Sequence, residues 1–252
     1  MRRQGIQLCY PFEEKRLLKW SKPFITQPKL DGDRCRAIPL EDRWQLVTSE
    51  GNEITSVPHI NEQLANIPRH SWMELDGELY NHHLPHNEIH AIVSRTVNLH
   101  EDYEEAEFHV FDVVSETLPQ TERMALLSHV ITMSRNVKNP NIVPVISHTA
   151  ENAEEIMDNY FTYLDYGYEG IIVRNPTGFY KRKRSTDIMK FKPKKSDWYE
   201  ITGYKEEVDK HGQPKDRLGA VICRGLDETE FSVGSGFTDH QRETLWPLRD
   251  NL

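Results

Sequence analysis

The sequence predicts an α+β domain with antiparallel sheets, followed by a smaller β module. Up to Pro193, short β-rich segments alternate with amphipathic helical segments, an order typical of α+β domains. After Pro193 the segments are β-rich and punctuated by glycine. A length of 252 residues suits one large domain plus a small one. We therefore expect a first domain over residues 1–195 and a second over residues 196–252.

Helices are predicted where apolar residues recur at three- and four-residue spacing. The clearest is 120–136, in which Met124, Leu127, Val130 and Ile131 share one face, and Pro58 favours a helix start near residue 57. The predicted helices cover residues 13–20, 57–67, 87–97, 120–136, 151–166 and 238–246. Strands are predicted where β-branched and aromatic runs are bounded by turn residues. They cover residues 24–27, 35–38, 44–48, 72–80, 108–114, 142–146, 168–174, 188–193, 198–206, 219–225 and 229–235.

The formal net charge is −9, but the charge is unevenly distributed. Residues 180–195 hold eight basic side chains against one acid, so this window carries +7 and the remainder −16. A concentrated basic face on an acidic body can bind phosphates locally. We expect Lys181, Arg182, Lys183 and Arg184 to contact nucleic acid; a solvated loop is the alternative.

Composition also bears on the cellular location of the protein. No apolar run approaches 18 residues, so we expect no membrane contact. The segment Met1-Arg2-Arg3-Gln4 lacks the apolar stretch of a signal peptide. Three scattered cysteines without paired spacing indicate neither a disulfide framework nor a zinc site. We expect a cytoplasmic protein.

One short stretch combines a lysine, two acids and an arginine around a glycine: Lys29-Leu30-Asp31-Gly32-Asp33-Arg34. Lys29 follows a predicted strand, and a lysine amine is a strong nucleophile once its pKa is lowered. Asp31 could bind a metal or orient the amine, and Arg34 offers a planar fork for phosphate or ribose oxygens. The alternative is an ordinary Asp-Gly turn with solvated charges.

The strand at 72–80 alternates acids with apolar residues. Glu74, Asp76 and Glu78 share one face, where they repel each other unless cations or a ribose lie beside them. A solvated edge strand is the alternative. Next to it stand four histidines at positions 82, 83, 86 and 90; irregular spacing and the absence of a nearby cysteine argue against zinc.

Three later segments carry further candidates. Phe111 lies in the β-rich run 108–114 and has a core position as its alternative role. Glu169 opens a predicted strand, where its side chain can project into a cleft and bind Mg²⁺ directly or through water. Lys190 and Lys192 share one strand face, and paired ammonium groups can clamp a triphosphate.

Six of these segments, in this order, resemble the motifs of the covalent nucleotidyltransferases, and most of all the small ATP-dependent DNA ligases of viruses and bacteria. Motif I matches residues 29–34, motif III Asp76-Gly77-Glu78, motif IIIa Phe111-Asp112, motif IV Glu169-Gly170 and motif V Lys190-Phe191-Lys192. The sixth match is the Glu122-Arg123 pair. The resemblance spans residues 20–246 and implies an ATP-grasp-like nucleotidyltransferase domain followed by a small OB-fold β-barrel.

The resemblance also implies roles. Lys29 would attack the α-phosphate of ATP and carry AMP, and Phe111 would stack on adenine. The remaining expected nucleotide contacts are Gln27, Arg34, Glu78, Glu169, Lys190 and Lys192. Expected ligands of Mg²⁺ or Mn²⁺ are Asp31, Glu78 and Glu169, and Arg34 and Arg174 join residues 181–184 as expected nucleic-acid contacts. The implied partner is nicked double-stranded DNA, bound by a monomer in the cytoplasm of a bacterial or virus-infected cell.

The sequence departs from the family pattern at three places. Glu50 stands where an arginine usually follows the serine, Arg174 stands where lysine is frequent, and motif VI has only a poor match at Leu248-Arg249-Asp250. An RNA ligase or other lysyl-nucleotidyltransferase is one alternative. A non-catalytic DNA-binding module is another, but binding alone does not require acids inside a phosphate site.

Overall fold

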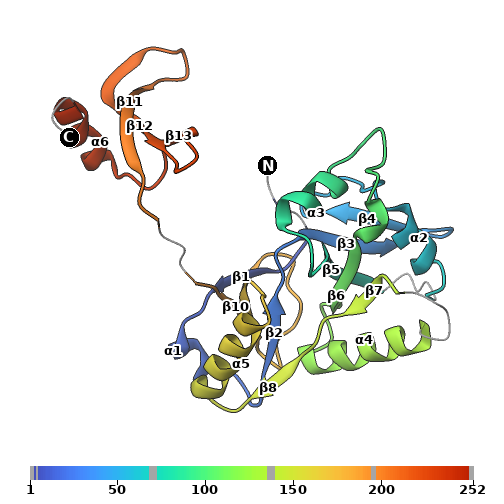
Figure 1. Ribbon diagram of the computed structural model, residues 1–252. Helices are drawn as coiled ribbons and strands as arrows, with labels where there is room; N and C mark the ends of the chain where they lie inside the picture. Colours follow the sequence, from blue (N-terminus) through green and yellow to red (C-terminus); the bar gives the residue numbers. More distant parts are fainter. Residues whose placement is uncertain (1–2, 4, 68–72, 135–139, 194–196, 250–252) are drawn as a thin grey trace. The chain divides into compact units, whose positions relative to one another are not determined.

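The computed structural model describes residues 3, 5–67, 73–134, 140–193 and 197–249. The chain divides into two compact units, Met1–Pro193 and Lys194–Leu252 (Figure 1). Some positions used in the sequence analysis lie outside the described residues, as does the expected domain boundary between residues 195 and 196. They are Met1, Arg2, Gln4, Trp72, residues 135–136, Lys194, Lys195 and Asp250.

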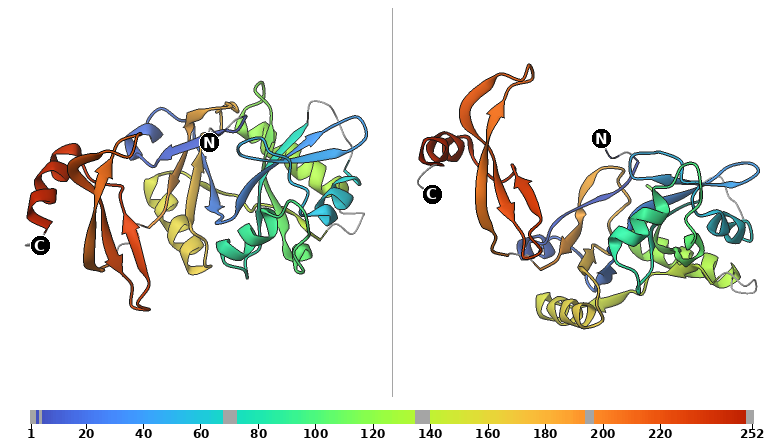
Figure 2. Two further views of the ribbon diagram at one scale, coloured as in Figure 1. Left: turned by 90° about the horizontal axis from the view of Figure 1, so that it is seen from above. Right: turned by 45° about the horizontal axis from the view of Figure 1, so that its top comes forward.

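The first sheet of unit 1 has the strand order β1-β10-β9-β2-β8. Its strands are β1 (Leu8–Pro11), β2 (Phe24–Lys29), β8 (His148–Ala150), β9 (Gly170–Arg174) and β10 (Arg184–Phe191). The helix α5 (Ala153–Asp165) packs against β9, β2 and β8 (Figure 2). Its apolar face buries Ile156, Tyr160 and Tyr163 against Phe24 and Val173, and α1 (Glu14–Leu17) adds Leu17 to this core.

The second sheet of unit 1 has the order β4-β3-β5-β6-β7. Its strands are β3 (Asp33–Pro39), β4 (Trp44–Thr48), β5 (Glu74–Tyr80), β6 (Glu107–Val114) and β7 (Ile142–Pro144). The helices α2 (Pro58–Leu64), α3 (His86–Val93) and α4 (Gln120–Ser134) pack on it, and η1 (Tyr103–Glu105) precedes β6. The buried residues of this sheet and its helices form the larger core of the chain.

Over residues 197–249, unit 2 contains the sheet β11-β12-β13 and the helix α6. The hairpin of β11 (Glu200–Val208) and β12 (Pro214–Arg224) is joined by β13 (Glu230–Val233). The helix α6 (Asp239–Leu248) begins at a capping box in which Thr238 and Gln241 satisfy each other's backbone N–H groups. It contributes Leu245 and Trp246 to a small core around Leu218.

The α+β class is confirmed, with two differences in detail. The sheets are mainly antiparallel, but β1 pairs with β10 and β6 pairs with β7 in parallel. The strands β1 and β8 were not predicted, because each is very short and lies at a sheet edge, where alternation is a weak signal.

Candidate active site

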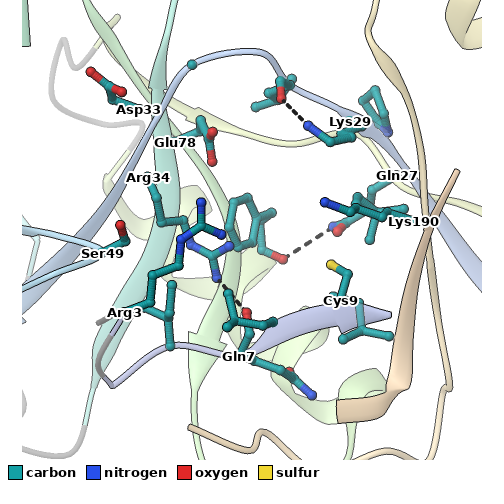
Figure 3. Close-up of a pocket in the computed structure, with 18 of the residues that line it drawn as sticks. Arg3, Gln7, Cys9, Gln27, Lys29, Asp33, Arg34, Ser49, Glu78 and Lys190 are labelled. Atoms are coloured by element: carbon teal, nitrogen blue, oxygen red, sulfur yellow. Dashed lines mark hydrogen bonds between the residues drawn. The ribbon is translucent and has the colours of Figure 1, made fainter. Parts of the chain in front are cut away.

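The predicted residues Gln27, Lys29, Arg34, Glu78, Phe111, Arg174, Arg184 and Lys190 line one cavity of about 500 Å³ in unit 1. A volume of this size is typical of small-molecule sites. The cavity draws on β1, β2, β3, β5, β6, β9 and β10, so it lies where the two sheets of the unit meet (Figure 3). Three other expected site residues, Asp31, Glu169 and Lys192, are not among the lining residues, and Asp31 is exposed.

Lys29 is the last residue of β2 and pairs in register with Gly170 of β9. The glycine is required by a close backbone approach, because a Cβ there would lie 2.2 Å from the carbonyl oxygen of Phe191. The backbone N–H of Glu169 donates to the carbonyl of Lys29 at 3.1 Å, and the Lys29 ammonium donates to the Glu169 carboxylate. Two residues far apart in sequence are thus fixed beside each other by sheet pairing.

Glu169 also accepts a hydrogen bond of 2.5 Å from Lys192. Burial alone would raise the pKa of Glu169, but the hydrogen bonds from Lys192 and Lys29 outweigh burial and lower it. The same contact raises the pKa of Lys192. The result is an ionised carboxylate between two ammonium groups at the end of the sheet.

Lys190, two residues earlier, lines the cavity while its neighbour Met189 is fully buried. Phe191 packs on Tyr160 with ring centroids 4.6 Å apart. The alternation predicted for this strand is therefore confirmed, with the lysines and the apolar residues on opposite faces.

Glu78 behaves differently from Glu169. Burial raises its pKa to about 8, against the opposing effect of the nearby Arg34 and Lys29 charges. Its carboxyl group is therefore largely neutral at neutral pH and can both donate and accept hydrogen bonds, as a ribose hydroxyl requires. Gly32 lets the motif I loop approach this strand, because a Cβ there would lie 2.2 Å from the carbonyl of Leu79.

Arg34 is held by Asp76 through two hydrogen bonds of 2.7 and 2.6 Å. Its guanidinium carbon lies 4.6 Å from the centroid of the Phe111 ring, which is a cation–π distance. Tyr180 donates a further hydrogen bond of 2.6 Å to Asp76. Glu74 pairs with Arg36 and Arg182. Each of the three acids of β5 therefore has a cation nearby, as expected for three carboxylates on one face of a strand.

Arg174 is buried, and the Nε and Nη1 groups of its guanidinium donate to three side chains. It donates to Asp112 at 2.8 Å, to Gln27 at 2.7 Å and to Gln120 at 3.1 Å, and its guanidinium carbon lies 5.4 Å from the Phe111 ring centroid. Arg174 also lines the cavity. These contacts do not support the DNA contact expected for it, because they hold the buried guanidinium against side chains of the fold.

The basic stretch is also partly neutralised within the chain. Lys181 pairs with Asp187 at 2.5 Å, and Arg182 pairs with Glu74 at 2.8 Å and with Glu116 at 3.0 Å. Arg184 donates to the carbonyl of Cys9 and lines the cavity, and exposed Lys183 has no side-chain partner among the described residues. Of residues 181–184, Lys183 is therefore the cation that remains exposed and unpaired, as expected for a nucleic-acid contact.

Several lining residues escaped the sequence analysis. The segment before and within β1 contributes Arg3, Ile6, Gln7, Leu8 and Cys9. Asp112 and Arg123, already matched as motif residues, do not line the cavity but form a buried ion pair of 2.8 Å, and a lone acid in a buried strand is a sequence signal for such a cation. The N-terminal segment carried no such signal.

The described residues contain no group of three or more acidic, histidine or cysteine side chains that could hold a metal. Asp31, Glu78 and Glu169 therefore do not form a shared carboxylate cage. Mg²⁺ is usually bound by one or two carboxylates together with substrate phosphates. Glu169 does not line the cavity itself, but it is ionised and contacts the lining residue Lys29, so it fits that arrangement. His86 and His90 flank Asp33 instead, at 3.7 and 2.8 Å.

A family model described as "ATP dependent DNA ligase domain" matches residues 7–192. The chain belongs to this ATP-dependent DNA ligase family. A DNA ligase of Haemophilus influenzae is 26% identical over 96% of the chain and 82% of that protein. A DNA ligase of African swine fever virus is 29% identical over 83% of the chain. The match covers 50% of that viral protein.

Solved structures share the fold. A Lig E DNA ligase superposes with a TM-score of 0.77 at 20% identity, covering 95% of this chain and 87% of that one. A Chlorella virus DNA ligase–adenylate superposes with a TM-score of 0.60 at 21% identity, covering 98% and 87%. Within the described ranges, no helix combines the length and apolarity needed to cross a membrane.

Proposed function

We propose that the chain seals nicks with a 5′-phosphate and a 3′-hydroxyl in duplex DNA, through an AMP-carrying Lys29 and an adenylated DNA. The observation that carries this proposal is the placement of the Lys29 ammonium against Glu169, at the wall of a nucleotide-sized cavity. The family assignment supports the use of ATP.

In the first step, Lys29 Nζ attacks the α-phosphorus of ATP, a P–N bond forms, and the bond to the β-phosphate breaks with release of pyrophosphate. The attacking amine must lose a proton, and the carboxylate of Glu169 is in contact with it. Lys190 lines the cavity and Lys192 pairs with Glu169, so both could offset the charge that develops on the leaving group.

The nucleoside part of ATP would lie across the rest of the cavity. Phe111 is the stacking surface, while Glu78 and Arg34 face the ribose and phosphate oxygens. Gln27 is held by Arg174 and donates to the Phe111 carbonyl at 3.3 Å, so it fixes the stacking strand relative to β2. Mg²⁺ or Mn²⁺, held by Glu169 and the phosphates, would neutralise phosphate charge when bound.

In the two later steps, a DNA 5′-phosphate oxygen attacks the Lys29-bound phosphorus and releases the amine. The 3′-hydroxyl then attacks the 5′-phosphorus and releases AMP. Duplex contacts would come from Arg184 at the cavity, from Lys183 in the exposed loop and from unit 2. We assign residues 1–195 as the adenylation domain and residues 196–252 as the OB-fold domain of a monomer. The three cysteines are free, as a reduced cytoplasm favours.

Labelled ATP and three nicked duplexes test this function. We expect acid-labile, alkali-stable label on the protein, and sealing of nicked DNA in preference to nicked RNA and hybrid duplexes. Sealing of nicked RNA alone would make the protein an RNA ligase. Absence of protein-bound label, with DNA binding retained, would make it a binding module.

A further inference from the structure

The cavity is lined by six lysine and arginine side chains, and most of them are already engaged. Lys29 pairs with Glu169, Arg34 with Asp76 and Arg174 with Asp112, while Arg184 donates to a backbone carbonyl. When a lysine or arginine pairs with a carboxylate of the protein, its positive charge is neutralised. It also has fewer N–H donors left for a substrate. In the described part of the chain, Arg3 and Lys190 are the lining cations without a side-chain hydrogen bond or ion pair.

These two free cations lie on different sides of the cavity. Lys190 is next to Lys29, on the side assigned to the triphosphate, whereas Arg3 is on the side of Arg34 and Ser49 (Figure 3). Arg3 precedes β1 in the chain, and β1 pairs with β10. The backbone N–H of Gln7 donates to Tyr180, and its carbonyl accepts from Arg34 at 3.4 Å, so the segment is tied to the Arg34–Asp76 pair.

The side where Arg3 lies also carries uncompensated negative charge. Glu50 and Ser49 line the cavity there, and no side-chain cation pairs with Glu50 among the described residues. A phosphate entering on this side would meet the Glu50 carboxylate, and Arg3 is the exposed cation able to counter it. An arginine fork is well suited to phosphate oxygens.

We propose that Arg3 binds the 5′-phosphate of the nick and so acts as a specificity-determining residue for the DNA steps. The proposal rests on the ligase function proposed above. After pyrophosphate has left, the DNA 5′-phosphate must be held within reach of the AMP phosphorus on Lys29, and its negative charge calls for a cation that the fold has not already paired. Arg3 supplies the free charge for that site, opposite Lys190.

The test compares nicked duplexes with a 5′-phosphate or a 5′-hydroxyl, using the full-length protein. We expect the wild type to bind the phosphorylated nick about tenfold more tightly, the size of one charge-assisted hydrogen bond. Arg3→Ala should lose this preference and slow sealing, while self-adenylation with ATP stays at the wild-type rate. Arg3→Lys should keep part of the preference, and Glu50→Arg in the Arg3→Ala background should restore it.

Arg43→Ala is the matched control, since Arg43 is exposed on a turn and does not line the cavity. It should behave as the wild type in every assay. A normal 5′-phosphate preference in Arg3→Ala would overturn the proposal, as would an equal loss of self-adenylation, which would assign Arg3 to ATP. Either result leaves wild-type sealing unaffected, so the proposed function is judged separately.

Discussion

The ammonium of Lys29 and the carboxylate of Glu169 are in direct contact although 140 positions separate them in the sequence. The contact is built by the pairing of β2 with β9, which places the two residues at the same sheet end. Glu169 binds Lys192 with its other oxygen. One carboxylate therefore positions both the proposed nucleophile and a proposed pyrophosphate contact.

Replacing Glu169 by Gln should lower the rate of self-adenylation by roughly 10²–10³, as loss of one preorganised charge partner typically does. The amide keeps the shape but carries no negative charge, so it no longer orders two ammonium groups. Single-turnover label transfer measures the rate, and Glu154→Gln on the exposed face of α5 is the control. A rate within a factor of three of the wild type would remove Glu169 from the chemistry.

Phe111 and Phe108 lie on the same strand but face different surroundings. Phe111→Ala should weaken ATP binding by roughly 1–3 kcal/mol with little loss of stability, because its partly exposed ring stacks on the base. Phe108→Ala should instead destabilise the fold by about 3–5 kcal/mol, since that ring is fully buried. Calorimetric ATP titration and urea unfolding separate the two effects. Should Phe111→Ala lose stability as Phe108→Ala does, Phe111 is a core residue.

Asp112 balances two buried guanidinium groups, those of Arg123 and Arg174. Asp112→Asn should cost about 3–5 kcal/mol of unfolding free energy, because both cations stay buried without a counter-charge. Urea unfolding checks the value, with Asp102→Asn, an exposed site in a loop, as the control. A loss below about 1 kcal/mol would mean that the carboxylate contributes little to this network.

The sequence revealed residues whose local pattern has a physical meaning. The face alternation of β5 and β10 and the turn at Asp31-Gly32 could all be read from neighbours in the chain. Lys29, Glu78 and Lys190 were accordingly expected in one site, and they line one cavity.

What could not be predicted depends on contacts between distant segments. The pairing of β1 with β10 brings Arg3 and Cys9 to the cavity. No sequence pattern within residues 3–11 predicts this pairing. Charge counting also treated residues 181–184 as free cations. The acidic partners of Arg182, which are Glu74 and Glu116, lie far from it in the sequence. Only the fold therefore shows that Arg182 is paired.

Glu78 makes stability depend on pH in a defined direction. Its pKa rises from an ordinary 4.5 to about 8 on folding, so the folded state holds a proton that the unfolded state releases. Stability should therefore fall as pH rises from about 4.5 to about 8, and level off above. Glu78→Gln should abolish this contribution and raise the melting temperature relative to the wild type more at pH 8 than at pH 5. An equal effect at both pH values would contradict the raised pKa.

The central claim is that Lys29 carries the AMP, and intact and peptide mass spectrometry after incubation with ATP and Mg²⁺ tests it most directly. We predict one added AMP, located on Lys29, in the wild type and none in Lys29→Ala, which should keep the wild-type melting temperature because Lys29 lies at a strand end. An AMP adduct on the Lys29→Ala protein, or on another residue of the wild type, would contradict the account.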